Sequence, residues 1–421
     1  MPVSQTRVES LPHAIFLQRV SGNASPTSLE ARLGQGAFLA LRLVDLLAPG
    51  REPVSPDAFH YQCVATDRFC RELRGTSPEG AHVHGTTASA ADAYRLGDVR
   101  QVVPALLAYA HFLEDELRLE EALDVLATLL EVGGDRLAAS DAVAARLRIA
   151  RVSRKLNRFD EAEAAYAEAG ELAAARGDRY SELLSRIGRA NTVLGRGNLA
   201  EAERSLRAIL ADARAADLHD AEARAEHGIG ATAFYRGHPD EAVPRFWRAF
   251  ELYEEEDSRL RALNDLGVTL LMLGDATGAE HALSEVVHRG GNQDNLTNAL
   301  IELMHCASYR RDRVGFARWR ERCEARVADM PPNILADFYL KQGIGQARFG
   351  QYRRAEALME EALRVATAAG LHESEFRIER IKNGLRECEQ ALRVEPAVPA
   401  EPVFDTAELR EVSASLARLV G

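Results

Sequence analysis

The stretch LNDLGVTLLMLGDATGAEHAL, residues 263–283, contains the pattern that decides the fold. A small residue, Gly267, stands twelve positions before a second small residue, Ala279, and the large apolar Leu283 follows four positions later. Gly274 lies between them, where a helix commonly ends on a residue in the left-handed conformation. Positions four apart share one face of a helix. The stretch therefore predicts two antiparallel helices whose backbones approach closely at the small residues.

This pattern recurs along the chain at intervals of 37 to 40 residues. Self-similarity at a fixed period indicates stacked helix pairs, each of which buries its apolar face only against its neighbours. In the sixth copy Phe316 takes the place of the small residue. The small residues of the other second helices are Ala122, Ala162, Ala202, Ala242, Ala279 and Ala355, and those twelve positions earlier are Ala110, Ala150, Ala190, Gly230, Gly267 and Gly343.

The phrase Leu263-x-x-Leu266-Gly267-x-x-Leu270, followed by Gly274-Asp275 and Ala279, resembles the tetratricopeptide repeat. Seven copies cover residues 98–373. Their period exceeds the 34 residues usual for that family and resembles the long-helix variety found in bacterial regulators and kinesin light chains. The resemblance implies an all-α fold, a right-handed α-solenoid of antiparallel helix pairs whose first helices line a concave groove. No strand pattern competes with it.

The sequence outside the repeats divides by composition into five segments. We predict a flexible N-terminus at 1–27, an N-terminal helical cap or degenerate repeats at 28–97, a capping helix at 374–393, a proline-rich linker at 394–404 and an amphipathic helix at 405–421. Within the N-terminal cap, residues 76–87 are expected to form a polar loop. The last helix has an apolar stripe that needs a covering surface. We favour the chain's own repeats as that surface, with a partner or self-association through 405–421 as the alternatives.

Composition restricts the class of partner. The chain has 64 acidic and 52 basic residues and a formal net charge of -12, which makes a nucleic-acid partner unlikely. All but three of the cations are arginine, a bias typical of GC-rich bacterial genomes.

The first nineteen residues contain only a four-residue apolar run, too short for a secretory signal. No membrane-length apolar segment is present, and five cysteines without CxxC spacing favour reduced thiols. We therefore expect a cytoplasmic bacterial protein without a membrane partner.

The sequence contains no motif that would carry catalysis. It has no Walker loop, no Gly-x-Ser-x-Gly elbow and no His-Glu-x-x-His. His82 and His84 could supply two metal ligands, but no third is spaced to join them. We therefore expect no enzymatic activity, no catalytic residues, no cofactor and no metal.

The resemblance directs attention to the first helices, which line the groove of tetratricopeptide proteins. At the corresponding positions this chain has a basic cluster in the second repeat and aromatic and polar residues in later ones. The candidate partner-binding residues are Arg148, Arg151, Arg154, Lys155, Asn191, Arg224, His227, Phe234, Tyr235, Arg261 and Asn264. Lys341 and Arg348 take the same positions in the seventh repeat.

These residues indicate a scaffold or adaptor that binds a protein segment or peptide, with an acidic character matched to the arginines. The aromatic side chains would anchor an apolar residue of that partner. An alternative hypothesis is a sensor or regulatory module in which a small peptide or metabolite changes the shape of the superhelix. A further alternative is that the arginines are solvated and that their stems cover apolar surface.

Overall fold

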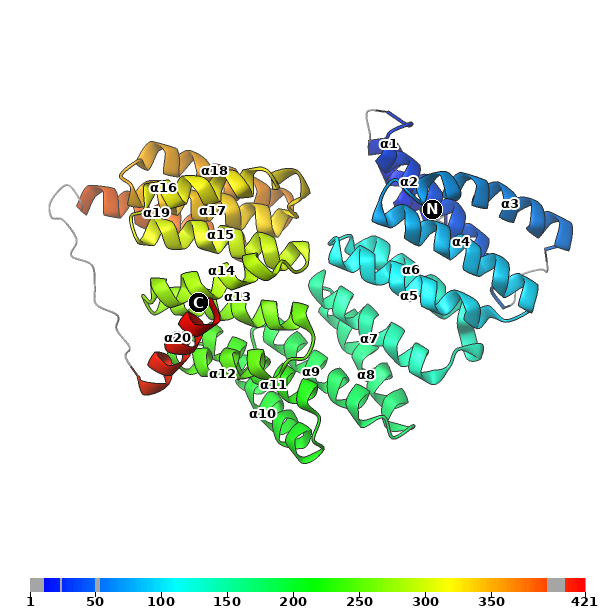
Figure 1. Ribbon diagram of the computed structural model, residues 1–421, viewed down its shortest axis with the longest axis horizontal. Helices are drawn as coiled ribbons and strands as arrows, with labels where there is room; N and C mark the ends of the chain where they lie inside the picture. The colour runs from blue at the N-terminus through cyan, green and yellow to red at the C-terminus, as the bar shows by residue number, and fades with distance from the viewer. Residues whose placement is uncertain (1–10, 23–24, 50–53, 392–405, 421) are drawn as a thin grey trace, which may run out of the picture. The chain divides into compact units, whose positions relative to one another are not determined.

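A computed structural model describes residues 11–22, 25–49, 54–391 and 406–420. Throughout these ranges the regular secondary structure is helical, without a strand (Figure 1). The chain divides into two compact units, residues 1–197 and 198–421. The division falls inside the third predicted repeat, between its first and second helices.

The first unit is a succession of helices joined by short connections. They are α1 (Ala14–Gly22), α2 (Leu29–Asp45), α3 (Pro56–Leu73), α4 (Pro78–Leu96), the 3-10 turn η1 (Val99–Val102), α5 (Val103–Asp115), α6 (Leu119–Gly133), the 3-10 turn η2 (Gly134–Arg136), α7 (Ala139–Lys155), α8 (Phe159–Ala174) and α9 (Arg179–Gly195). Neighbours along the chain pack on one another, α5 on α6, α7 on α8 and α8 on α9.

The second unit continues the same arrangement. Its helices are α10 (Leu199–Ala215), α11 (His219–Tyr235), α12 (Pro239–Leu252), α13 (Glu256–Met272), α14 (Ala276–Arg289), α15 (Gln293–Tyr309), α16 (Arg313–Glu324), the 3-10 turn η3 (Val327–Asp329), α17 (Pro332–Arg348), α18 (Tyr352–Ala368), α19 (His372–Ala391) and α20 (Ala407–Val420). Sequential packing of such pairs makes the fold an all-α solenoid, as predicted.

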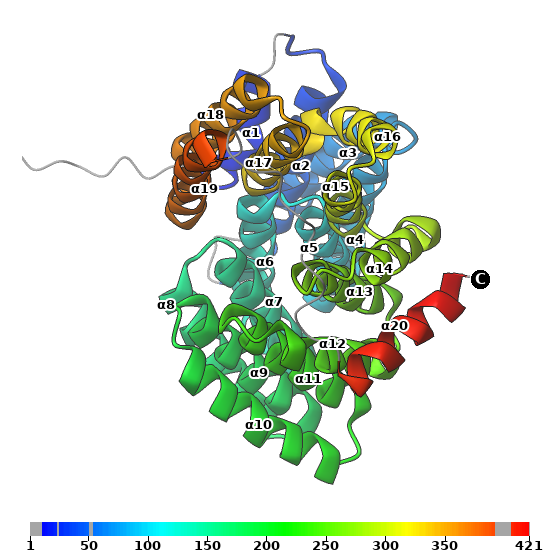
Figure 2. The same cartoon turned by 90° about the vertical axis from the view of Figure 1, so that its left-hand side faces the viewer.

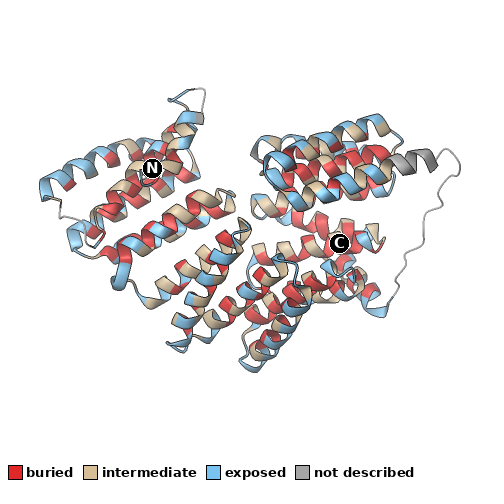
Figure 3. Cartoon of the chain, turned by 180° about the vertical axis from the view of Figure 1, so that it is seen from behind, coloured by how far each residue is buried: buried red, intermediate tan, exposed pale blue. Residues whose placement is uncertain are grey.

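The repeat register read from the sequence coincides with the core. The small residues of the second helices, from Ala122 to Ala355, are fully buried. The large side chain four positions after each is also buried, as in Leu126, Phe246 and Met359. Figure 3 shows buried positions recurring along the helices. Small residues at the contact points therefore let the paired helices approach each other closely.

The turn inside each repeat ends on a residue in the left-handed conformation. Gly197, Gly237, Gly274 and Gly350 have φ values of 84, 81, 85 and 79°, as expected for helix-ending glycines. The other three copies use Leu117, Asn157 and Arg311 at the same place, with φ between 58 and 62°. The left-handed turn is thus maintained in all seven repeats even where a side chain makes it less favourable.

The bulky Phe316 of the sixth repeat is accommodated by a glycine of the next. Its ring is buried and lies edge-on to Phe349, with 5.3 Å between centroids. A Cβ atom added at Gly345 on α17 would lie 2.3 Å from the Phe316 ring. Gly345 therefore supplies the space that a small residue at position 316 would otherwise have left.

Two expectations for the N-terminal region were wrong. Residues 14–22 of the predicted flexible N-terminus form helix α1, whose Phe16 is fully buried. The predicted polar loop at 76–87 is helical from Pro78 onward, because Ser77 caps α4 by accepting the Gly80 N–H at 3.1 Å. The polar residues of this segment misled the prediction because two of them, Thr86 and Thr87, donate their hydroxyl groups to carbonyl oxygens of their own helix.

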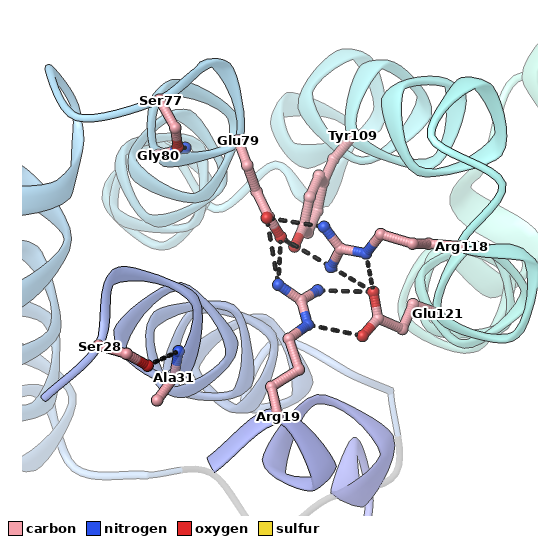
Figure 4. A network of polar contacts seen from close by, with 9 residues as sticks. All are labelled: Arg19, Ser28, Ala31, Ser77, Glu79, Gly80, Tyr109, Arg118 and Glu121. Atoms are coloured by element: carbon pink, nitrogen blue, oxygen red, sulfur yellow. Dashed lines mark hydrogen bonds and ion pairs between the residues drawn. The ribbon is translucent and has the colours of Figure 1, made fainter. Parts of the chain in front are cut away.

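A buried network of charged groups holds α1 in place (Figure 4). Arg19 donates to Glu79 of α4 at 2.9 Å and to Glu121 of α6 at 2.8 Å. Arg118 contacts the same two carboxylates, and the Tyr109 hydroxyl donates to Glu79 at 2.9 Å. Each of the two buried carboxylates therefore has two arginines, which compensates the cost of removing it from water.

The C-terminal helix α20 packs against its own chain, as favoured from the sequence. It contacts α12 and α14, which are second helices of two repeats (Figure 2). Leu409, Val412 and Leu416 are buried there, and the Ser413 hydroxyl donates to Asp275 at 2.6 Å. The predicted linker, residues 394–404, lies outside the described residues.

Candidate functional site

The basic cluster predicted on the second repeat surrounds a single carboxylate. Arg148, Arg151 and Lys155 follow one another at helical spacing on α7, so their side chains extend from one face. Their nitrogen atoms lie 2.7, 2.7 and 2.9 Å from the carboxylate oxygens of Glu114 on α5. The Glu114 side chain is fully buried, whereas the three cations remain between one quarter and two fifths exposed. Glu114 thus fixes the positions of three cations at the surface.

The electrostatics of this cluster keep Glu114 ionised. Burial alone would raise the pKa of Glu114, but the charges of Arg151, Lys155 and Arg148 outweigh burial and hold the pKa below its usual value. The four groups together carry a positive formal charge. Arg154 points to a different neighbour, Tyr166 of α8, whose pKa is raised by burial and lowered in part by a hydrogen bond with Arg154.

Asn191, the remaining candidate residue of the first unit, is separate from the basic cluster on α7. It is half-buried on α9, and its side chain makes no hydrogen bond within the described residues. The candidate residues of the first unit therefore form one cluster on α7 and one separate amide on α9.

In the second unit, three of the candidate residues meet around Tyr253, which follows α12. The Arg224 guanidinium lies over the Tyr253 ring, 5.9 Å from its centroid, and Arg224 also pairs with Asp220 at 2.6 Å. The pKa of Tyr253 is raised mainly by burial, while the charges of Arg261 and Arg224 and a hydrogen bond with Arg261 oppose that rise. Helices α11 and α13 thereby each place one arginine, Arg224 and Arg261, next to one buried phenol.

His227 on α11 contacts the same phenol. Its Nδ1 is 3.2 Å from the Tyr253 hydroxyl and its Nε2 is 2.7 Å from Asp265. Since a carboxylate only accepts, Nε2 carries the proton and Nδ1 accepts from Tyr253. Burial lowers the pKa of His227 despite the neighbouring Asp265. Tyr253 is only 3% exposed, so this arrangement orients buried side chains and presents no nucleophile to solvent.

The remaining candidates of the second unit have different surroundings. Phe234 and Tyr235 at the end of α11 lie edge-to-face, 5.6 Å apart, and Tyr235 is 62% exposed. Asn264 is buried on α13 and donates from Nδ2 to the carbonyl oxygen of Asn295 at 2.9 Å. Asn264 therefore holds the start of α15, whereas Tyr235 lies at the surface and Phe234 is partly buried against the core.

Sequence reasoning missed the anions and the phenol that organise these clusters. Glu114, Tyr253 and Asp265 were not among the candidates because single acidic or aromatic residues carry no motif. In the seventh repeat the sequence identified Lys341 but not its two partners, which are Glu302 of α15 and Asp337. A pairing signal did exist, since Lys341 and Asp337 are four residues apart on one helix face.

The described ranges contain neither a candidate metal site nor a candidate membrane-spanning helix. No three His, Cys, Asp or Glu side chains gather there in a way that could hold a metal ion. No helix in those ranges is long and apolar enough to cross a membrane.

Comparison with known proteins identifies similar folds only. No family model matches the chain, and no curated protein matches it. Among solved structures, NprR in complex with its cognate peptide NprX has 12% identity and a TM-score of 0.48, covering 80% of this chain and 86% of NprR. The apo form of RapI has 9% identity and a TM-score of 0.47, covering 63% and 99%. Aspartyl phosphate phosphatase F from Bacillus subtilis has 13% identity and a TM-score of 0.46, covering 82% and 95%.

Proposed function

We propose that the protein is an interaction scaffold or adaptor that binds an acidic protein segment on the surfaces of its first helices. The observation that carries the proposal is the α7 cluster, in which Arg148, Arg151 and Lys155 converge on the one buried carboxylate of Glu114. The setting of this activity would be the bacterial cytoplasm, where the free thiols of the four described cysteines would stay reduced.

The cluster suits recognition because its cations are already ordered. Long basic side chains lose conformational freedom when they bind, and this loss weakens affinity. Glu114 holds Arg151 and Lys155 while leaving 40% and 26% of their side chains exposed. Carboxylates of a partner would gain charge-assisted hydrogen bonds to these side chains at a reduced entropic cost.

The second unit offers an apolar contact for such a segment. Tyr235 is exposed next to Phe234, and aromatic side chains of this kind commonly provide much of the binding free energy at protein interfaces. We therefore propose the end of α11 as a second contact surface, separate from the α7 cluster, that takes an apolar residue of a protein segment.

The test compares a fluorescent Glu-rich peptide with a Gln-rich peptide of the same length by anisotropy, using the full chain. The acidic peptide should bind more tightly, and its affinity should fall with salt. In the double variant Arg151→Gln and Lys155→Gln, affinity should fall by about tenfold. Arg148 remains in this variant to compensate Glu114, so the fold should persist.

The matched control changes the same kind of residue on another face of the same helix. Arg146 pairs with Glu168 of α8 and is not in the cluster. Arg146→Gln should leave peptide affinity unchanged. Equal binding of the Glu-rich and Gln-rich peptides, or an unaltered affinity in the double variant, would refute the proposal. If the peptides bind as expected, purification of the protein from its host with one stoichiometric partner would identify the natural segment.

A further inference from the structure

A cavity of about 540 Å³ lies in the first unit, where three connections between helices come together. Small-molecule sites usually have volumes of ~300–1,000 Å³. The connections are those between α4 and α5, α6 and α7, and α8 and α9. Each contributes one arginine to the lining, namely Arg100, Arg136 and Arg176. Arg151 and Lys155 do not line this cavity, so it is separate from the proposed adaptor surface.

Two of the three arginines have no carboxylate partner in the described part of the chain. Arg100 makes two hydrogen bonds to Asp98, at 2.8 and 2.9 Å, and is therefore compensated. Arg136 donates to two backbone carbonyl oxygens, at 3.2 and 3.3 Å. Arg176 is exposed and forms no ion pair with any described residue. The uncompensated charges of Arg136 and Arg176 favour an anionic ligand.

One carboxylate, that of Asp178, also lines the cavity. It caps α9 by accepting the backbone N–H of Ser181 at 3.0 Å, and hydrogen bonds to backbone and side chain of Ser181 lower its pKa. Asp178 is thus ionised and already occupied by α9. Even with Asp98 and Asp178 counted, the arginines leave the site positive.

The N-terminus of α7 supplies further donors. Ala138 occupies the capping position, so no side chain there accepts from the backbone N–H groups of the first turn. Ala138, Ala139 and Ser140 all line the cavity. Unsatisfied N–H groups and the positive end of the helix dipole attract negatively charged oxygen atoms. At α9, in contrast, Asp178 accepts the backbone N–H of Ser181, so the two helix starts at this cavity differ in their capping.

Apolar side chains form the rest of the lining, namely Leu137, Val143, Leu172 and Ala173. We propose that this cavity binds a small organic carboxylate with a short apolar chain. The carboxylate lies at the start of α7 between Arg136 and Arg176, and the chain contacts the apolar residues. Such a group can be a free organic acid or the C-terminal residue of a peptide, since both present the same chemistry.

The experiment measures binding to the full-length protein by isothermal titration calorimetry. The probes are hexanoate, a blocked tripeptide ending in a leucine with a free carboxylate, its C-terminal amide, and inorganic phosphate. Hexanoate or the free-carboxylate peptide should bind, and which of them binds more tightly identifies the source. The amide and inorganic phosphate should bind much more weakly, because each lacks one half of the recognised chemistry.

Three variants connect the binding to this cavity. Arg136→Gln with Arg176→Gln should weaken binding by about tenfold or more. Ala138→Asp gives α7 its own capping carboxylate, so it should raise the melting temperature while abolishing binding. Arg179→Gln is the control, because Arg179 is the first residue of α9, pairs with Glu182 and does not line the cavity.

Either carboxylate probe must bind for the proposal to stand. Absence of binding by both, tighter binding of phosphate or the amide, or full affinity in the Ala138→Asp protein would overturn it. An equal loss of affinity in Arg179→Gln would also overturn it, because the effect would then come from general surface charge. Since Ala138→Asp is expected to stabilise the fold, its loss of binding cannot be attributed to unfolding.

Discussion

Replacing His13 by glutamine should change how the stability of the first unit depends on pH. His13 precedes α1 and lies between two carboxylates, with Nδ1 2.5 Å from Asp124 and Nε2 3.2 Å from Asp45. Burial by itself lowers the pKa of His13, but hydrogen bonds and charge attraction from Asp124 and Asp45 outweigh burial and raise the pKa to about 9. The protonated ring therefore links the start of α1 to α2 and α6.

The size of the effect follows from the difference between the folded and unfolded pKa values. A rise from 6.5 to about 9 corresponds to roughly 3 kcal/mol, at ~1.4 kcal/mol for each pKa unit. Because the folded value is the higher one, this contribution is fully present below pH 6.5. It is lost progressively as the pH rises toward about 9. His13→Gln removes the charge at every pH, so the variant lacks this dependence.

Urea unfolding followed by circular dichroism measures the difference between the two proteins. The wild type should exceed His13→Gln in stability by about 3 kcal/mol near pH 6, and the difference should nearly vanish near pH 10. Titration of the His13 ring by NMR checks the pKa directly. A ring that titrates near its ordinary value, or a stability difference that does not change with pH, would refute the reasoning.

Three further substitutions test the packing of the second unit. Leu416→Ala should weaken the docking of α20 by about 2–5 kcal/mol and shift tryptophan fluorescence to the red, because Trp247 on α12 belongs to the same apolar cluster; an unchanged spectrum would contradict this. Gly345→Val should lower the free energy of unfolding by about 1–3 kcal/mol, because the added side chain clashes with the Phe316 ring on α16. Thermal melts measure this loss, and adding Phe316→Leu should restore part of the stability. Lys341→Met should lower the free energy of unfolding by about 3–5 kcal/mol, measured by urea denaturation. Adding Glu302→Gln should recover part of this loss, and the absence of any recovery would count against the ion pair between Lys341 and Glu302.

The candidate site was only partly predictable from sequence. The helical spacing of Arg148, Arg151 and Lys155 is sufficient to place the three side chains on one face of a helix. That spacing does not identify Glu114, because the contact joins α7 to α5 across 34 or more residues. Likewise, the position of Asn264 in its repeat suggested a ligand contact, whereas its amide in fact donates to the carbonyl group of Asn295.

What the sequence by itself determined is the repeating architecture: small residues at fixed spacing, a large apolar residue one turn later and a left-handed turn in the repeats whose first helix is followed by glycine. These features are local, because helix periodicity and close backbone contact depend on residues within about forty positions of one another. Only the tertiary structure decided that α1 is held by buried charges, that α20 covers α12 and α14, and that three arginines share one cavity. Those contacts join residues that are far apart in the chain, and their energies depend on burial and distance, which no single stretch of sequence contains.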